Sequence, residues 1–178
     1  EFMNAMFSSA NNFNQDLSSW NFNMNAELGA FVANSGLNVS NYDALLQRYV
    51  QLNLPYNAVG IFDPNSLEYC DNFSRDILIQ NGWPISGDSQ SSTCPANTLS
   101  GSIFYDFDLN GCDPSDLESQ NVAITIIDGT NALTVYTYNG QYSVNLPDGT
   151  YTITPNINNA LFTATPVNVN VTLSNAVT

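Results

Sequence analysis

The stretch VAITIIDGTNALTVYTYNGQYSVNL, residues 122–146, decides the fold of the C-terminal half of the chain. In this stretch, apolar residues such as Val122, Ile124 and Ile126 alternate with small or polar residues. The pairs Asp128-Gly129 and Asn139-Gly140 separate the alternating runs. Alternation with a period of two places one set of side chains on one face of a strand, and Asp-Gly and Asn-Gly pairs favour tight hairpin turns. The stretch therefore predicts consecutive antiparallel strands that bury one face.

The same pattern continues on both sides of this stretch. Further short alternating runs are GSIFYDF (101–107), TYTITP (150–155), LFTAT (161–165) and VNVNVTL (167–173). Together with the three runs inside residues 122–146 they make seven short strands, which is the number in an antiparallel sandwich of immunoglobulin-like size. We therefore expect residues 100–178 to form an all-β, immunoglobulin-like sandwich.

An acidic segment, DFDLNGCDPSD (106–116), lies between the first two predicted strands. It places two aspartates and an asparagine at positions 1, 3 and 5 of a D-x-D-x-N-G loop, a glycine at position 6 and a backbone carbonyl at position 7, as a calcium loop requires. Two more aspartates follow. The segment predicts a Ca²⁺ site, and its candidate ligands are Asp106, Asp108, Asn110, the Cys112 carbonyl, Asp113 and Asp116.

Electrostatic repulsion favours a cation in this segment. Neighbouring carboxylates about 4 Å apart repel by several kcal/mol at an intermediate dielectric. A divalent cation between them makes the net interaction attractive. The segment is not an EF-hand, because Leu117 stands at position 12 and no helices flank it. Two other interpretations remain open: a solvated acidic turn that keeps the protein soluble, or a carboxylate pair for glycoside hydrolysis, which needs an acid of raised pKa in a cleft.

The N-terminal half has a different organisation. In MFSSANNFNQDLSSWNF (6–22) the apolar residues follow neither a helix nor a strand period, but Met6, Phe7 and Ala10 recur 25 residues later as Phe31, Val32 and Ser35. Such a period is typical of solenoid repeats. We expect Trp20 to be a core residue of this repeat rather than a sugar-stacking surface, and the asparagines to occupy solvated turns rather than a ligand-binding ladder.

Two helices are expected after the repeat, where they would cover its last apolar face. The first is SNYDALLQRYVQLN (40–53), with Ser40 or Asn41 as N-cap; the second runs from about residue 68 to 81 and ends at Gly82. Trp83 follows directly and can close this cap. The polar segment 87–101 marks a boundary, so the expected domains are residues 1–90 and 100–178, with a linker over 91–99.

Two family resemblances add to these predictions. MFSSANNFNQDLSSWNF, with NYDALL (41–46) and YCDNFSRDILIQNGWPISGD (69–88), resembles a repeat unit and the C-terminal cap of BspA-like leucine-rich-repeat surface proteins of bacteria. GSIFYDFDLNGCDPSDLESQNVAITIIDG (101–129) resembles the opening of Cna-B-type and SdrD B-like modules, except that Asp113 and Asp116 fall one position early. The resemblances imply an α+β two-domain chain: the end of a leucine-rich-repeat solenoid with a helical cap, then the sandwich.

The cap resemblance also implies a disulfide between Cys70 and Cys94. Because the chain has three cysteines, one would be left over. A bond between Cys94 and Cys112, or three free cysteines, are the alternatives.

Composition restricts the partners and the chemistry. Sixteen residues are acidic and only two, Arg48 and Arg75, are basic, which gives a net charge of −14. Nucleic acids and anionic membranes are therefore poor partners, and no stretch reaches the roughly 20 apolar residues of a membrane span. Histidine and lysine are absent, which removes the commonest general base and Schiff-base chemistry. We expect no enzymatic activity.

The resemblances imply a secreted, cell-surface fragment of adhesin type. Its repeats would bind an extracellular protein or glycan, and its calcium-stabilised sandwich would act as a stalk. We expect further repeats upstream in the parent chain, with Glu1-Phe2 a remnant of cloning. The alternatives are an accessory domain of a larger secreted enzyme, or a carbohydrate-binding module whose candidate aromatics are Tyr105, Tyr136, Tyr138 and Tyr142.

Overall fold

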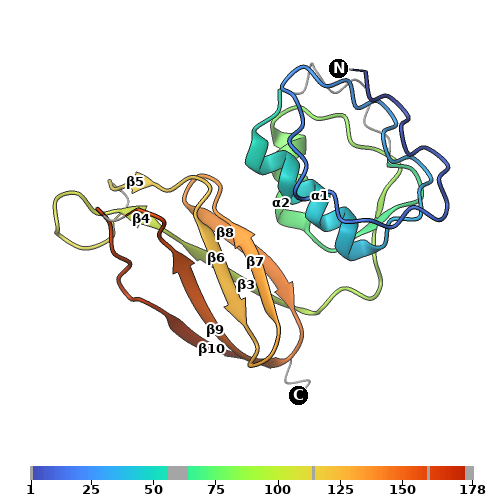
Figure 1. Cartoon of the computed structure of the whole chain (residues 1–178). Coiled ribbons are helices and arrows are strands. Elements are labelled where there is room, and N and C mark those ends of the chain that lie inside the picture. Colours follow the sequence, from blue (N-terminus) through green and yellow to red (C-terminus); the bar gives the residue numbers. More distant parts are fainter. Residues whose placement is uncertain (1, 56–63, 114, 160, 175–178) are drawn as a thin grey trace. The chain divides into compact units, whose positions relative to one another are not determined.

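The computed structural model divides the chain into two compact units, Glu1–Cys94 and Pro95–Thr178 (Figure 1). It describes residues 2–55, 64–113, 115–159 and 161–174. Among these residues, no helix is both long and apolar enough to span a membrane.

The N-terminal unit begins with two coils of chain that lie side by side, a first coil of residues 2–25 and a second coil of residues 26–38. Backbone amides of Met3, Ala5, Phe7 and Ser9 in the first coil donate to carbonyls of the second, over 2.7–3.0 Å; the accepting residues are Glu27, Gly29, Phe31 and Ala33. Within each coil, an amide donates to the carbonyl three residues earlier, as Met6 does to Met3 and Phe31 does to Leu28. This internal pattern repeats at an offset of 25, which confirms the predicted register. Two coils do not by themselves show a leucine-rich-repeat solenoid.

Asparagine side chains join the two coils. The Asn4 Oδ1 accepts from the Gly29 amide at 2.7 Å, and the Asn14 Oδ1 accepts from the Asn38 amide at 3.0 Å and from the Asn41 Nδ2 at 2.7 Å. These asparagines are therefore not only solvated turn residues. They satisfy backbone donors that the coil geometry leaves open.

Helix α1, Val39–Leu52, continues the second coil and buries Tyr42, Leu45, Leu46 and Tyr49. Its N-cap is Asn38, whose side chain accepts from the Asn41 amide at 2.9 Å. The predicted caps Ser40 and Asn41 are therefore wrong: Asn38 has the extended backbone of a cap residue, and its side chain satisfies a free amide of the first helical turn.

The predicted second helix begins later than expected. Residues Glu68–Tyr69 form strand β1, which pairs in parallel with β2, Ser89–Gln90, and helix α2 covers only Asn72–Gln80. The Asp71 side chain caps α2 by accepting from the Ser74 amide at 2.9 Å. The end of the helix agrees with the prediction, since Gly82 has a φ of 89°.

The two tryptophans have different environments. Trp83 is 3% exposed and its Nε1 donates to the Leu54 carbonyl at 3.3 Å, so it lies in the core of the N-terminal unit as predicted. Trp20 is 37% exposed and meets Phe7 edge-on, with 5.9 Å between ring centroids. The prediction that Trp20 is a core residue is therefore wrong for this structure.

A disulfide joins Cys70 to Cys94, which confirms the pairing that the cap resemblance implied. Cys112 remains a free, exposed thiol. The bond ties the residue just before α2 to the last residue of the N-terminal unit.

The C-terminal unit is built of strands. They are β3 (Asn97–Ser102), β4 (Phe104–Tyr105), β5 (Leu117–Glu118), β6 (Ala123–Ile127), β7 (Ala132–Tyr136), β8 (Gln141–Leu146), β9 (Gly149–Asn156) and β10 (Val169–Leu173). One sheet has the order β10-β9-β6-β7, and β3 pairs with β8 and β4 with β5, all antiparallel (Figure 1).

One hydrophobic core lies between these strands. Its buried residues come from the four-stranded sheet and from the β3-β8 pair: Leu99, Ile124, Ile126, Val135, Tyr142, Leu146, Tyr151 and Ile153. This arrangement is consistent with a β-sandwich. Gly101 of β3 makes room for the buried Tyr142 ring of β8, because a Cβ at that position would lie 2.6 Å from the tyrosine oxygen.

Two predicted features of this half differ from the structure. The run LFTAT (161–165) is not a strand. The Asn159 side chain accepts a hydrogen bond from the Leu161 amide, and the Asn159 carbonyl accepts one from the Phe162 amide. Pro166, which follows the run, has no backbone amide to donate to a neighbouring strand. The segment expected to be a linker, 91–99, contains the first half of β3, and the boundary between the two units falls between Cys94 and Pro95.

The junction between α1 and α2 contains several carboxylates. Asp88 accepts two hydrogen bonds from Arg75, at 2.7 and 2.8 Å, and a third from the Tyr42 hydroxyl at 3.0 Å. Asp43 accepts from the amides of Cys70 and Asp71, each at 3.0 Å. Burial raises the pKa of Asp43 to about 6, although these hydrogen bonds act to lower it. Burial also raises the pKa of Asp71.

The raised pKa of Asp43 predicts that the N-terminal unit becomes more stable as the pH falls. A carboxyl group whose pKa is higher in the folded than in the unfolded state stabilises the fold when it is protonated. The Asp43 contribution is complete below pH 3.8, its ordinary pKa, and it is lost as the pH rises through about 6. We expect the unfolding free energy to increase by about 2 kcal/mol between pH 7 and pH 4.5. In Asp43→Asn the increase should be clearly smaller in urea melts; an unchanged pH dependence would contradict this assignment.

The disulfide predicts a large loss of stability on its removal. It closes a segment with a sequence separation of 24, and a loop of that size stabilises a fold by about 3 kcal/mol. The double variant Cys70→Ser, Cys94→Ser should lose about this amount in chemical denaturation, whereas Cys112→Ser should leave the midpoint unchanged. Titration of the native chain with a thiol reagent should find one reactive cysteine, and three would contradict the pairing.

Candidate metal site in the loop between β4 and β5

The acidic loop is held at both ends by a strand pair. Phe104 lies opposite Glu118 and Tyr105 opposite Leu117 in the β4-β5 ladder. Asp106 follows β4 directly and Asp116 precedes β5 directly. Because the strands are antiparallel, the two ends of the loop return to the same place, and they bring these aspartates together although ten positions separate them.

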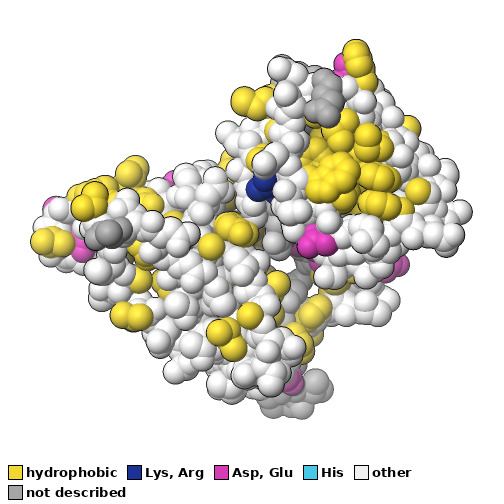
Figure 2. Space-filling view, viewed as in Figure 1, with side chains coloured by type: hydrophobic (Ala, Val, Ile, Leu, Met, Phe, Trp, Pro, Cys, Tyr) yellow, Lys and Arg dark blue, Asp and Glu magenta, His cyan; other side chains and the backbone are white. Residues whose placement is uncertain are grey.

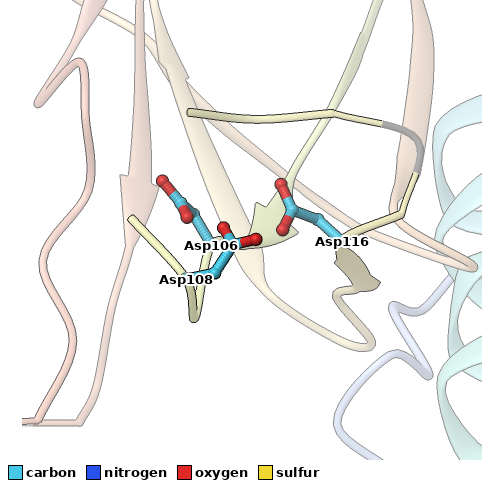
Figure 3. A group of neighbouring side chains, drawn as sticks. All are labelled: Asp106, Asp108 and Asp116. Carbon is cyan, nitrogen blue, oxygen red and sulfur yellow. The ribbon is translucent and has the colours of Figure 1, made fainter. Parts of the chain in front are cut away.

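Three carboxylates converge there. Asp106, Asp108 and Asp116 each offer an oxygen, and these atoms lie within 4.8 Å of one another (Figure 3). Asp106 and Asp116 are half-buried and Asp108 is exposed. The alternation D-x-D puts the first two side chains on the same side of the loop, and the return of the chain supplies the third.

Local hydrogen bonds fix the loop around these side chains. Asp108 accepts from the Asn110 amide at 3.2 Å and from the Asn110 Nδ2 at 2.8 Å. The Asp106 Oδ2 accepts from the Gly111 amide at 3.1 Å, and the Asp116 Oδ2 accepts from the Asp113 amide at 2.9 Å. Gly111 has a φ of 97°, a conformation that favours glycine and that the loop pattern anticipated.

One oxygen of the cluster has no hydrogen-bond partner. The Asp106 Oδ1 is buried and accepts no hydrogen bond from the residues that the structure describes. Buried carboxylate oxygens are normally hydrogen-bonded or coordinated to a metal, because desolvation without a partner costs free energy. A cation between the three carboxylates would provide that partner.

The Asp113 carboxylate does not belong to this group. The Asp113 Oδ1 accepts instead from the Ser115 amide at 2.6 Å, and hydrogen bonds from Ser115 lower the Asp113 pKa. The Asn110 Nδ2 donates to Asp108. The Asn110 Oδ1 and the Cys112 carbonyl, the two uncharged ligands predicted for this loop, stay a prediction. Of the six candidate ligands, the structure therefore gathers Asp106, Asp108 and Asp116, and the full ligand set remains a prediction.

The donor set indicates which metals fit. All three side chains are carboxylates, and neither histidine nor cysteine belongs to the group. Oxygen donors of this kind suit hard cations such as Ca²⁺ and Mg²⁺ rather than zinc or copper.

An apolar cavity beside the loop was not anticipated from the sequence. It has a volume of about 600 Å³, and its walls include Asp106, Ile124, Ile153, Phe162 and Pro166. Tyr105 also lines the cavity and contacts Phe162, with 5.1 Å between ring centroids. Asp106 is the only acidic residue among the described residues that line it.

The tyrosines named as sugar-binding candidates are dispersed. Tyr142 is buried in the core under Gly101, Tyr105 contacts Phe107 and Phe162, and Tyr136 lies on the edge strand β7. Tyr138 bridges to Gln141 beyond the end of that strand. A stacking platform that includes Tyr142 is excluded by its burial.

Comparisons of the chain with protein-family models, with curated proteins and with solved structures find no match.

The position of Asp113 outside the carboxylate cluster predicts unequal effects of two matched substitutions. Asp106→Asn removes a clustered charge but keeps the acceptor for Gly111, and it should weaken Ca²⁺ binding about tenfold or more. Asp113→Asn removes a charge of the same loop outside the cluster and should change the affinity by less than about threefold. Isothermal titration with CaCl₂ measures both, and equal losses would contradict the three-carboxylate geometry.

Proposed function

We propose that this chain is a non-enzymatic part of a secreted bacterial cell-surface protein. In this proposal, the N-terminal unit is the capped end of a BspA-like leucine-rich-repeat region that binds an extracellular protein or glycan. The C-terminal unit is an immunoglobulin-like module, similar to Cna-B-type and SdrD B-like modules, that serves as a calcium-stabilised spacer.

The observation that carries the proposal is the cluster of Asp106, Asp108 and Asp116 at the root of the β4-β5 loop. A cation held there would tie the end of β4 to the start of β5, because its ligands come from both ends of the loop. Its contribution is therefore mechanical and structural rather than catalytic. Weak sites of this kind, with dissociation constants of roughly 10⁻⁴ to 10⁻³ M, are typical of extracellular modules, where calcium is abundant.

Two further features agree with an extracellular location. The disulfide between Cys70 and Cys94 is of a kind that persists in oxidising compartments and is rare in the cytosol. The surface has few charges apart from its carboxylates, since only 10% of the residues are charged and only two are basic. Both features support the extracellular location.

Thermal melting tests the proposed role of calcium. A ligand that binds only the folded state stabilises it by RT ln(1 + [L]/Kd), so 1–10 mM CaCl₂ should add about 0.4–3 kcal/mol to the C-terminal unit. We expect its melting temperature to rise by several degrees relative to EDTA.

Two controls accompany this measurement. The transition of the N-terminal unit should stay in place, and Asp106→Asn should reduce the difference between calcium and EDTA. If the native C-terminal unit melts at the same temperature in both solutions, calcium has no structural role here.

A further inference from the structure

The cavity beside the acidic loop opens between large apolar side chains. Its inner wall reaches the core of the C-terminal unit, because the buried Ile124 and Ile153 line it. Leu109 and Leu161 also line it although each is 87% exposed, so they stand where the cavity meets solvent. A volume of about 600 Å³ is in the range of ligand-binding clefts. The cavity is therefore large enough to take a bulky apolar group of a ligand.

Two phenylalanines extend this apolar area beyond the cavity. Phe162 lines the cavity and meets Phe107 edge-on, with 6.1 Å between ring centroids. Phe107 is itself 66% exposed. We call Phe107, Leu109, Leu161 and Phe162, together with the cavity beside them, the mouth surface. Contiguous exposed apolar patches of this kind mark interaction sites.

Leu109 combines an unfavourable backbone conformation with an exposed side chain. Its φ is 60°, in the left-handed region that residues with bulky side chains rarely adopt. Its side chain gains no burial in exchange. Residues held in such conformations cluster at functional sites. A leucine at this position is therefore better explained by contact with a ligand than by the folding of the loop.

Negative charge surrounds the mouth surface. The C-terminal unit has no basic residue, since Arg48 and Arg75 both belong to the N-terminal unit. Five of its acidic residues lie within the short segment 106–118: Asp106, Asp108, Asp113, Asp116 and Glu118. A divalent cation in the carboxylate cluster would compensate two of these five charges and leave three. Figure 2 shows hydrophobic and acidic side chains near one another at the end of the unit that bears β4 and β5.

We propose that the mouth surface binds a basic, apolar segment of another polypeptide. One apolar side chain of the segment enters the cavity, and its lysine or arginine side chains lie beside the carboxylates of the loop. The charge selects this class of partner, because the carboxylates attract a basic segment and repel an acidic one. A second copy of the chain fits poorly, since its net charge is −14. This binding role goes beyond that of a spacer and does not require calcium in the cluster.

Fluorescence anisotropy of short labelled peptides tests the proposal. The full chain is kept in EDTA, so that the result does not depend on calcium binding. The probe is the peptide Lys-Leu-Phe-Lys-Leu-Lys. One matched peptide has glutamate in place of each lysine, and another has serine in place of each leucine and phenylalanine. We expect the probe to bind about tenfold more tightly than either matched peptide, and its affinity should fall as the NaCl concentration rises.

Three substitutions locate the binding surface. Leu109→Ser and Leu161→Ser each remove an exposed apolar side chain of the mouth surface and should weaken probe binding about fivefold. Leu133→Ser is the matched control, because Leu133 lies on β7, is 39% exposed and is not among the described residues that line the cavity. It should leave probe binding unchanged. Circular dichroism checks that all three variants are folded.

Three outcomes would overturn the proposal. One is equal affinity for the basic and the acidic peptide, or equal binding of the probe by the native chain and both mouth variants. Another is sedimentation of the native chain with phosphatidylcholine vesicles that Leu109→Ser abolishes, which would assign the surface to a membrane. The last is a dimer of the native chain that the same substitution dissociates, which would assign the surface to self-association.

Discussion

The N-terminal unit depends on hydrogen bonds between successive coils of its chain. In a helix the backbone satisfies most of its own groups, but here the amides of Met3, Ala5, Phe7 and Ser9 find acceptors only in the neighbouring coil. Each coil is therefore stable only beside another, or beside a lid. Helices α1 and α2 provide the lid on one side, with Tyr49 and Trp83 in contact at 5.0 Å between ring centroids.

Most of the fold could be predicted because its patterns are local. The alternation over residues 122–146 corresponds to β6, β7 and β8, and the 25-residue register appears in the hydrogen bonds of the two coils. Features that depend on a distant partner were missed. Glu68–Tyr69 became a strand because Ser89–Gln90 lies beside it. The cap of α1 was misplaced for a different reason: the contact of Asn38 with the Asn41 amide is local, but Ser40 and Asn41 are also residue types that cap helices.

The carboxylates of the acidic loop, too, could be predicted only in part from the sequence. The spacing of Asp106 and Asp108 is enough to place two carboxylates together, because they alternate along one short segment. The choice between Asp113 and Asp116 depends on competition that spacing does not reveal. The Asp113 carboxylate accepts a hydrogen bond from the Ser115 amide. Asp116 directly precedes β5, and the pairing of β5 with β4 places it beside Asp106. The strand pair, rather than the loop sequence, selects the third carboxylate.

The Cys70–Cys94 bond has a consequence for a protein under tension. Cys94 is the last residue of the N-terminal unit, so a pull that arrives along the chain from Pro95 reaches the sulfur bridge first. The load then passes covalently to Cys70 and bypasses α2 and β2, which cannot be drawn out while the bridge is intact. Extension of the unit must begin upstream of Cys70. The bridge therefore shortens the length of polypeptide that a tether can release.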